Sequence, residues 1–247
     1  MMDEVRVSYE YEGRSFEGMI VCNGDPSERG VIFMQPDWTG VSPTMIACAR
    51  EIARDDYVVL VADMFGAGYA EKPKGFDDLM AGMLAVHKNL PFTLGCGSQA
   101  YEALLTEAAR LGLVNSAAPK CAVGYCAGGG FLLEQARAGQ DFDAVTVLHV
   151  TNPNPVIAGT PCNIKGRVLA VHGAVDPATP KAKVHELEEE LAAAGVDWQV
   201  MMFGEGRHAF CVPKESMHEA IRYDEKLCRL AYLLMHDFFA QTSAANA

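Results

Sequence analysis

Short, continuous apolar runs recur along the chain, and glycine, proline or polar residues bound each of them. Runs of this kind are typical of strands buried on both faces of a sheet. They lie at residues 30–35, 57–62, 120–123, 144–150, 167–171 and 198–203. Ahead of them, residues 5–11 and 16–21 flank Glu12-Gly13-Arg14 and predict a β-hairpin.

Segments with a helical spacing of apolar residues separate these strands. We predict helices over residues 44–54, 76–89, 98–112 and 127–138, a helix capped by Thr179-Pro180, and a final one over about 216–239. The alternation predicts an α/β fold whose mainly parallel sheet is covered by helices on both faces. No linker or repeat interrupts it, so we expect one domain over residues 1–247.

Composition and charge narrow the class of protein. A chain of 247 residues with 50% hydrophobic and 21% charged residues is not disordered. A net charge of −12 argues against nucleic acid and anionic membranes as partners. The sequence has no signal-peptide pattern at its start and no apolar run near the ~18 residues of a membrane helix. We expect a cytoplasmic monomer or small homo-oligomer that acts on a small molecule.

Eight cysteines raise the question of disulfides, metals and redox chemistry. The closest pair is Cys121 and Cys126, and no C-x-x-C is present, so zinc and thioredoxin motifs lack support. In a reducing cytosol we expect thiols that mostly act as small buried apolar side chains. We expect no metal ion and no organic cofactor.

One cysteine differs from the others because of its surroundings. Gly124-Tyr125-Cys126-Ala127-Gly128 follows a predicted strand and opens a predicted helix, as a nucleophile elbow does. The sharp turn brings the flanking positions together, so Gly124 and Gly128 must be small. Cys126 would lie at a helix N-terminus, which favours a thiolate, and the amide of Ala127 would face a developing oxyanion.

Two further side chains follow strands at the same predicted edge of the sheet. Asp176 comes after the strand at 167–171, and His208 comes after the strand at 198–203. The order nucleophile, acid, base is that of α/β hydrolases, which predicts a triad of Cys126, Asp176 and His208. His149 and His172 also follow strands, and we interpret both as structural histidines.

These motifs together resemble the dienelactone hydrolase family over nearly the whole chain. The resemblance rests on VGYCAGGG, HGAVDPATP, VDWQVMMFGEGRHAF and an aromatic-rich terminal helix. It implies an eight-stranded α/β-hydrolase sheet and attack of Cys126 on an ester or lactone carbonyl. It also implies that Asp37, in Asp37-Trp38-Thr39-Gly40, stands where the family has a glutamate that contacts the nucleophile, and that the Trp38 amide is a second oxyanion donor.

The chain departs from the family where well-known members bind a substrate carboxylate with two arginines. Val212 stands four residues beyond His208, where one arginine is expected. The helix near 80–90 offers His87 and Lys88 but no arginine. Lys88, Arg207 and Lys72 are the candidates to supply positive charge, so a carboxylated dienelactone is not implied.

Three other functions remain open. A general carboxylesterase or thioesterase would use the same residues and differ only in its pocket. A small-molecule receptor would keep the pocket without needing the triad. A thiol redox protein would need a resolving cysteine, and alternation along the strand places Cys121 on the face opposite Cys126.

Overall fold

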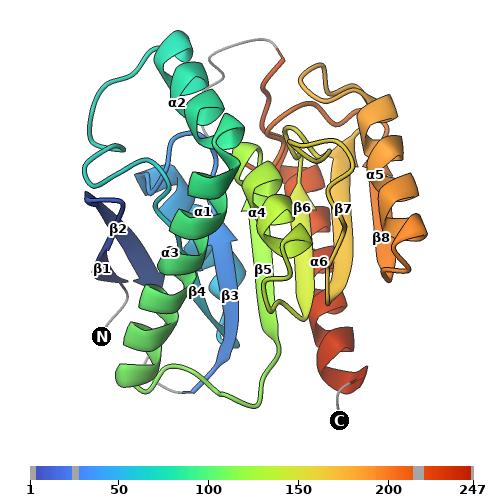
Figure 1. Cartoon of the computed structure of the whole chain (residues 1–247). Helices are drawn as coiled ribbons and strands as arrows, with labels where there is room; N and C mark the ends of the chain where they lie inside the picture. The colour runs from blue at the N-terminus through green and yellow to red at the C-terminus, as the bar shows by residue number, and fades with distance from the viewer. Residues whose placement is uncertain (1–3, 24–27, 214–219, 246–247) are drawn as a thin grey trace.

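The strands of the computed structural model, which describes residues 4–23, 28–213 and 220–245, form a single sheet. They are β1 (Glu4–Tyr11), β2 (Arg14–Val21), β3 (Gly30–Gln35), β4 (Tyr57–Val61), β5 (Lys120–Tyr125), β6 (Ala144–Leu148), β7 (Arg167–Gly173) and β8 (Trp198–Phe203). The order across the sheet is β1-β2-β4-β3-β5-β6-β7-β8, and the pairs β1–β2 and β2–β4 are antiparallel (Figure 1). The other neighbouring strands pair in parallel, which confirms the predicted fold class.

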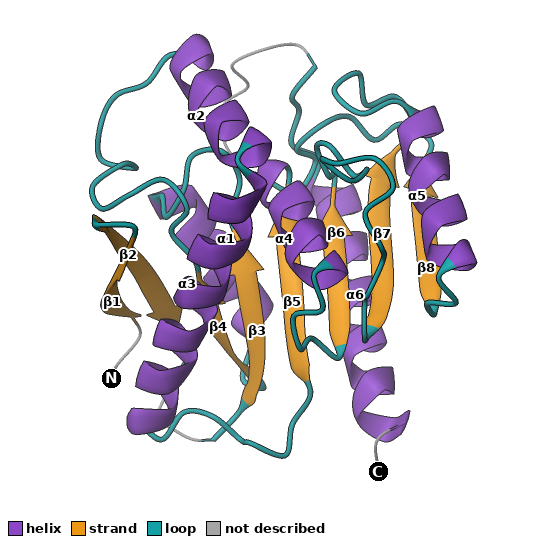
Figure 2. Cartoon of the chain, in the orientation of Figure 1, coloured by secondary structure: helices purple, strands orange, loops and turns teal. Residues whose placement is uncertain are grey.

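Helices cover both faces of this sheet. They are α1 (Pro43–Ala53), α2 (Phe76–Lys88), α3 (Leu90–Arg110), α4 (Ala127–Arg137), α5 (Lys181–Ala193) and α6 (Glu225–Ala245). Figure 2 shows α3, α4 and α5 in front of the strands and α6 behind them. β6 is buried at every position, whereas the edge strands β1 and β8 alternate in exposure. Five of the six continuous apolar runs therefore mark strands that are buried on both faces. The run at 198–203 corrects the expectation, because it forms the edge strand β8 and has no fully buried position.

Two helix starts differ clearly from the prediction. α3 begins at Leu90 rather than 98, because Pro91 fits a first helical turn and the Asn89 side chain caps the Phe92 amide at 3.3 Å. Glycine has a low helix propensity, and Gly97 lies within α3. A Cβ on Gly97 would lie 2.6 Å from the Gln135 side chain of α4. Close packing of α3 against α4 thus favours glycine at position 97. The same glycine lowers the helix propensity from which the start of α3 was predicted.

The last helix begins at Glu225 rather than near Ser216, which lies outside the described residues. Residues 220–224 are not helical, and the Asp224 side chain accepts from the Leu227 amide at 3.0 Å. α5 begins at Lys181, directly after the predicted Thr179-Pro180 pair, with Pro180 at the N-cap and no capping hydrogen bond from its side chain.

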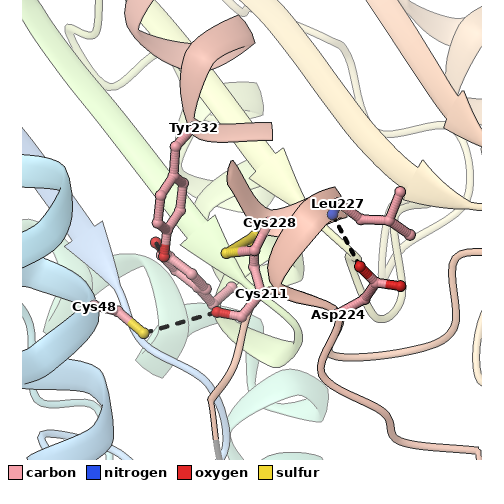
Figure 3. The surroundings of a disulfide bond; sticks show 7 residues. Cys48, Cys211, Asp224, Leu227, Cys228 and Tyr232 are labelled. Carbon is pink, nitrogen blue, oxygen red and sulfur yellow. Dashed lines mark hydrogen bonds between the residues drawn. A yellow bond between two sulfur atoms is a disulfide. The ribbon is translucent and has the colours of Figure 1, made fainter. Parts of the chain in front are cut away.

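A disulfide joins Cys211 to Cys228 and corrects the expectation that these cysteines are thiols (Figure 3). Their Cα atoms lie 4.5 Å apart, and Cys228 belongs to α6. The bond therefore ties the segment after His208 to the last helix. The Cys48 thiol, on α1, lies 3.8 Å from the Cys211 carbonyl oxygen. The other six cysteines, all within the described residues, are not disulfide-bonded.

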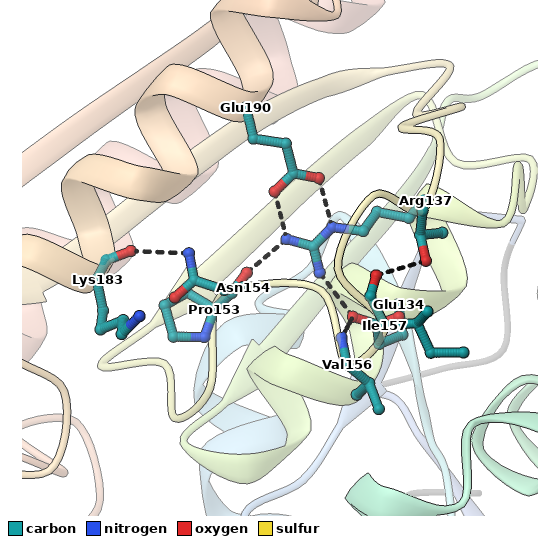
Figure 4. A network of polar contacts seen from close by, with 9 residues as sticks. Glu134, Arg137, Pro153, Asn154, Val156, Ile157, Lys183 and Glu190 are labelled. Atoms are coloured by element: carbon teal, nitrogen blue, oxygen red, sulfur yellow. Dashed lines mark hydrogen bonds and ion pairs between the residues drawn. The ribbon is translucent and has the colours of Figure 1, made fainter.

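A buried arginine connects three segments on the face of the sheet opposite to α6 (Figure 4). Arg137, 1% exposed, donates to Glu134 at 2.9 Å and to both carboxylate oxygens of Glu190 at 2.6 and 2.8 Å. The Nη2 nitrogen that donates to Glu190 also donates to the carbonyl of Pro153. This network holds α4, α5 and the loop after β6 together.

Within the described ranges, no helix combines the length and the apolar character that crossing a bilayer would require.

Candidate active site

Cys126 occupies a sharp turn between β5 and α4. Its φ of 53° lies in the left-handed region that few residues other than glycine adopt. The turn is held by the Cys126 amide, which donates to Leu148 of β6 at 3.1 Å, and by the Cys126 carbonyl, which accepts from Thr151 at 2.9 Å. Strain of this kind is maintained by surrounding structure and is common at active sites. The predicted elbow is therefore present.

The two elbow glycines are required for different reasons. A Cβ on Gly124 would lie 2.6 Å from the Cα of Gly129. A Cβ on Gly128 would lie 2.2 and 2.3 Å from the carbonyl oxygens of Gln35 and Pro36, at the end of β3. The two glycines also lie close together, as we predict from the turn, since a Cβ on Gly124 would lie 2.7 Å from the carbonyl oxygen of Gly128. In the structure Gly124 contacts the start of α4, and Gly128 allows α4 to pack against the neighbouring strand end.

His208 connects the cysteine to the aspartate. Its Nε2 lies 2.9 Å from Cys126 Sγ, and its Nδ1 lies 2.8 Å from Asp176 Oδ2. All three residues are buried. Burial alone lowers the pKa of His208, but the Cys126 sulfur and the hydrogen bond to Asp176 outweigh it and raise that pKa to about 10. The imidazole is thus held as a cation between two acceptors.

Asp176 is fixed by its own loop. Its Oδ1 accepts from the amides of Ala178 at 2.8 Å and Thr179 at 3.1 Å, which leaves Oδ2 facing His208. His172 Nε2 lies 2.9 Å from the carbonyl of Thr179 and 3.6 Å from Asp176 Oδ2. Burial lowers the pKa of His172, so a neutral ring supports the same loop. His172 therefore has the structural role that we predicted.

His149 and the loop of His208 pack against each other. The His149 ring lies edge-on to His208 at 5.6 Å and to Phe210 at 5.1 Å between centroids. The His208 carbonyl accepts from Arg222 at 2.9 Å, and the Phe210 carbonyl accepts from Asp224 at 3.0 Å. Together with the disulfide at Cys211, these contacts fix the loop that carries the histidine.

Thr151 is a site residue that the sequence reasoning missed. Its Oγ1 lies 3.4 Å from both Cys126 Sγ and His208 Nε2. Its position after β6 was a usable signal, since the end of that strand meets the same sheet edge as β5. Threonine is too common in loops for the residue alone to stand out.

Asp37 and Trp38 lie in the turn after β3 and line the same cavity as Cys126. Asp37 is 1% exposed, and its Oδ1 accepts from the Thr39 amide at 2.8 Å and from the Thr39 hydroxyl. Ala127 is the first residue of α4, so its amide has no acceptor within the helix. The roles of Asp37 and of the two amides stay predictions.

The cavity at Cys126 has a volume of about 290 Å³ and is mostly apolar. Val212 is 1% exposed in the core and does not line it. The cationic candidates are also elsewhere. Lys72 and Lys88 are exposed away from the lining, and Arg207 lines a different pocket with Arg222 and Glu205. Within the described ranges, no three His, Cys, Asp or Glu side chains gather as metal ligands would.

The sheet, its helices and the strand-to-helix turn after β5 define an α/β hydrolase whose nucleophile position holds a cysteine. The chain belongs to the dienelactone hydrolase family, whose model matches residues 16–243. No curated protein matches the sequence significantly. Family and fold together indicate a hydrolase.

Solved structures of similar fold agree with this assignment. A protein called m3DLH is 23% identical, with a TM-score of 0.86 over 97% of this chain and 98% of its own. A dienelactone hydrolase-like promiscuous phosphotriesterase, P91, from metagenomic libraries is 24% identical, with a TM-score of 0.85 over 97% and 98%. A dienelactone hydrolase of Anabaena variabilis is 14% identical, with a TM-score of 0.65 over 96% and 97%. These likenesses concern the fold.

Proposed function

We propose that this protein hydrolyses an ester or lactone through a triad of Cys126, His208 and Asp176 and a thioacyl-enzyme intermediate. The observation that carries this proposal is the continuous chain of contacts from sulfur to imidazole to carboxylate, at 2.9 and 2.8 Å, on the wall of an apolar cavity. Nucleophile and base within hydrogen-bond reach, with the base oriented by a third group, are the requirements of covalent acyl transfer.

In the first half of the reaction, Cys126 forms a bond to the carbonyl carbon. The thiol proton resides on His208, where Asp176 stabilises the imidazolium. The carbonyl π electrons move to oxygen, and the amides of Ala127 and Trp38 donate to that oxyanion. When the oxyanion collapses, the carbon–oxygen bond to the alcohol breaks. His208 gives its proton to the departing alkoxide.

In the second half, water cleaves the thioester. His208, now neutral, accepts a proton from water as it attacks the carbonyl carbon. The second tetrahedral intermediate expels the Cys126 thiolate and releases the carboxylic acid. A thiolate leaves more readily than an amine, so an amide adduct would revert to substrate, whereas an ester or lactone adduct can go forward. This chemistry requires no metal ion or organic cofactor.

A panel of p-nitrophenyl esters and simple lactones tests the proposal, with wild type, Cys126→Ala and Cys126→Ser. We expect Cys126→Ala to lose at least about 10³-fold in kcat, because the covalent step is removed. Mass spectrometry of quenched wild type should show one acyl group on the peptide that contains Cys126. Retained activity in Cys126→Ala would overturn the mechanism.

The same panel separates the remaining functions. Faster turnover of a dienelactone than of p-nitrophenyl acetate would favour a lactone hydrolase, and the reverse would favour a general carboxylesterase. An acyl thioester added to the panel tests thioesterase activity. Binding of these compounds without turnover by wild type would instead support a receptor.

A further inference from the structure

The helix that covers the nucleophile presents a row of apolar side chains to it. Phe76, Met80 and Met83 of α2 are spaced at i, i+4 and i+7, which places them on one face of the helix. All three line the cavity that contains Cys126. Figure 1 shows α2 above the ends of the central strands. Cys126 lies at the end of β5, one of these strands. A single helix therefore supplies three of the apolar side chains that line the cavity.

This row runs from the surface to the interior. Phe76 is 37% exposed and lies perpendicular to Trp38 at 5.3 Å between ring centroids. Met80 is half-buried, and Met83 is 4% exposed. From Phe76 to Met83 the helix rises about 10 Å. The row is thus long enough for an extended apolar group, and its exposed end is apolar as well.

Charge around the cavity is unsuited to an anion. Among the described residues that line it, none is a lysine or arginine, and Asp37 is acidic. His208 is the one basic side chain there, and Cys126 and Asp176 already engage it. Lys74, two residues before α2 in the sequence, donates to the carbonyls of Tyr69 and Lys72. A buried carboxylate would lose hydration without gaining a partner.

We propose that the substrate is a neutral ester whose apolar acyl group packs along Phe76, Met80 and Met83, and that α2 selects against substrates with a charged acyl end. The proposal rests on the function proposed above. Each methylene buried against this row should raise kcat/KM about fourfold until the cavity is filled. A carboxylate at the end of the acyl group should lower kcat/KM at least about 100-fold.

The experiment compares p-nitrophenyl acetate, butyrate and pentanoate with p-nitrophenyl hemiglutarate, which has a pentanoate chain ending in a carboxylate. We expect wild type to gain from acetate to pentanoate and to disfavour hemiglutarate. A flat chain-length series, or equal use of pentanoate and hemiglutarate, overturns the proposed substrate class while leaving the ester hydrolase intact.

Met80→Arg tests the role of α2, because a cation there supplies the missing partner. We expect the ratio of hemiglutarate to pentanoate kcat/KM to rise at least tenfold. Met201→Arg is the matched control, since Met201 is 39% exposed on β8, outside the cavity lining, and its ratio should not change. If the ratio of hemiglutarate to pentanoate kcat/KM were the same in both variants, α2 would not be the element that selects against a charged acyl end.

Binding to Cys126→Ala separates the substrate class from the reaction. Calorimetric titration with the pentanoate and hemiglutarate esters reports the cavity's preference without turnover. Tighter binding of pentanoate, by at least about tenfold, supports the inference even if wild type hydrolyses neither ester, in which case only the proposed reaction fails. Tighter binding of hemiglutarate refutes the inference.

Discussion

At the scale of single residues, the charge of His208 depends on Cys126 and Asp176. The sulfur lies 2.9 Å from Nε2, and its negative form favours the protonated ring, as Asp176 does from the other side. Burial acts in the opposite direction and lowers the pKa of His208.

Removal of the sulfur should therefore lower the pKa of His208. In Cys126→Ala the desolvation of the ring remains, whereas one of the two charges that oppose it is lost. We expect an NMR titration of the imidazole nitrogens to give a pKa of about 10 in wild type and a lower value in the variant.

His185 is an internal control for this titration. It is exposed on α5, and its pKa is raised by the hydrogen bond to Glu188, far from the site. Its titration should be the same in both proteins. An unchanged pKa of His208 in Cys126→Ala would show that the cysteine does not bear the charge that we assign to it.

At the scale of elements, the position of the nucleophile depends on how closely α4 approaches β3. Gly128 is the contact between them, and any side chain there meets two backbone carbonyls that cannot rotate away. We predict that Gly128→Ala lowers the free energy of unfolding by about 3 kcal/mol and reduces kcat, because α4 and Cys126 must shift. Urea unfolding and ester hydrolysis measure the two effects.

Gly204→Ala is the matched control for this substitution. Gly204 follows β8, and a Cβ there would have no atom within 4 Å. We expect its stability and activity to stay close to those of wild type. If both alanine variants behave alike, the close approach at Gly128 does not control the elbow.

The disulfide links the His208 loop to α6 and should stabilise the fold. Cys211 and Cys228 are 17 residues apart, and a loop of about that length is worth about 3 kcal/mol. We expect the free energy of unfolding of the Cys211→Ser, Cys228→Ser double variant, measured by urea denaturation, to be lower by that amount. Wild type in excess reductant should match it.

Cys162→Ser is the control, because Cys162 is half-buried and outside the disulfide. It should change the unfolding midpoint little. Alkylation of the denatured, unreduced protein gives a direct check, since six modified cysteines are expected. Eight modified cysteines would contradict the bond.

At the scale of the whole molecule, Arg137 connects α4 to α5 and to the loop that carries Thr151. Replacement by methionine would leave Glu134 and Glu190 facing each other with no cation. Loss of one partner from a buried ion pair costs about 3–5 kcal/mol. We predict that Arg137→Met lowers the free energy of unfolding by this amount in urea.

Arg110→Met provides the comparison, because Arg110 makes an equally short pair with Glu107 on the surface of α3. Solvent screens that pair, so its loss should barely change stability. Similar destabilisation by both variants would mean that the buried ion pairs of Arg137 stabilise the fold no more than the exposed pair of Arg110.

The sequence predicted much of the fold and of the site because both depend on residues near strand ends. Continuous apolar runs identified the inner strands, and the order of Cys126, Asp176 and His208 placed the three residues at one sheet edge. The contact of Thr151, the pairing of Cys211 with Cys228 and the apolar row of α2 depend on how distant segments pack. The start of α3 was missed because Gly95 and Gly97 weaken helix propensity where tight packing needs them.

The backbone at Cys126 also restricts which nucleophiles this fold can use. A φ of 53° is tolerable for an unbranched side chain but strongly disfavoured for one branched at Cβ. Serine could replace the sulfur by oxygen without disturbing the turn, whereas threonine, although it has the same hydroxyl, would strain the elbow. Among the thiol and hydroxyl nucleophiles, the turn therefore accepts cysteine and serine and disfavours threonine.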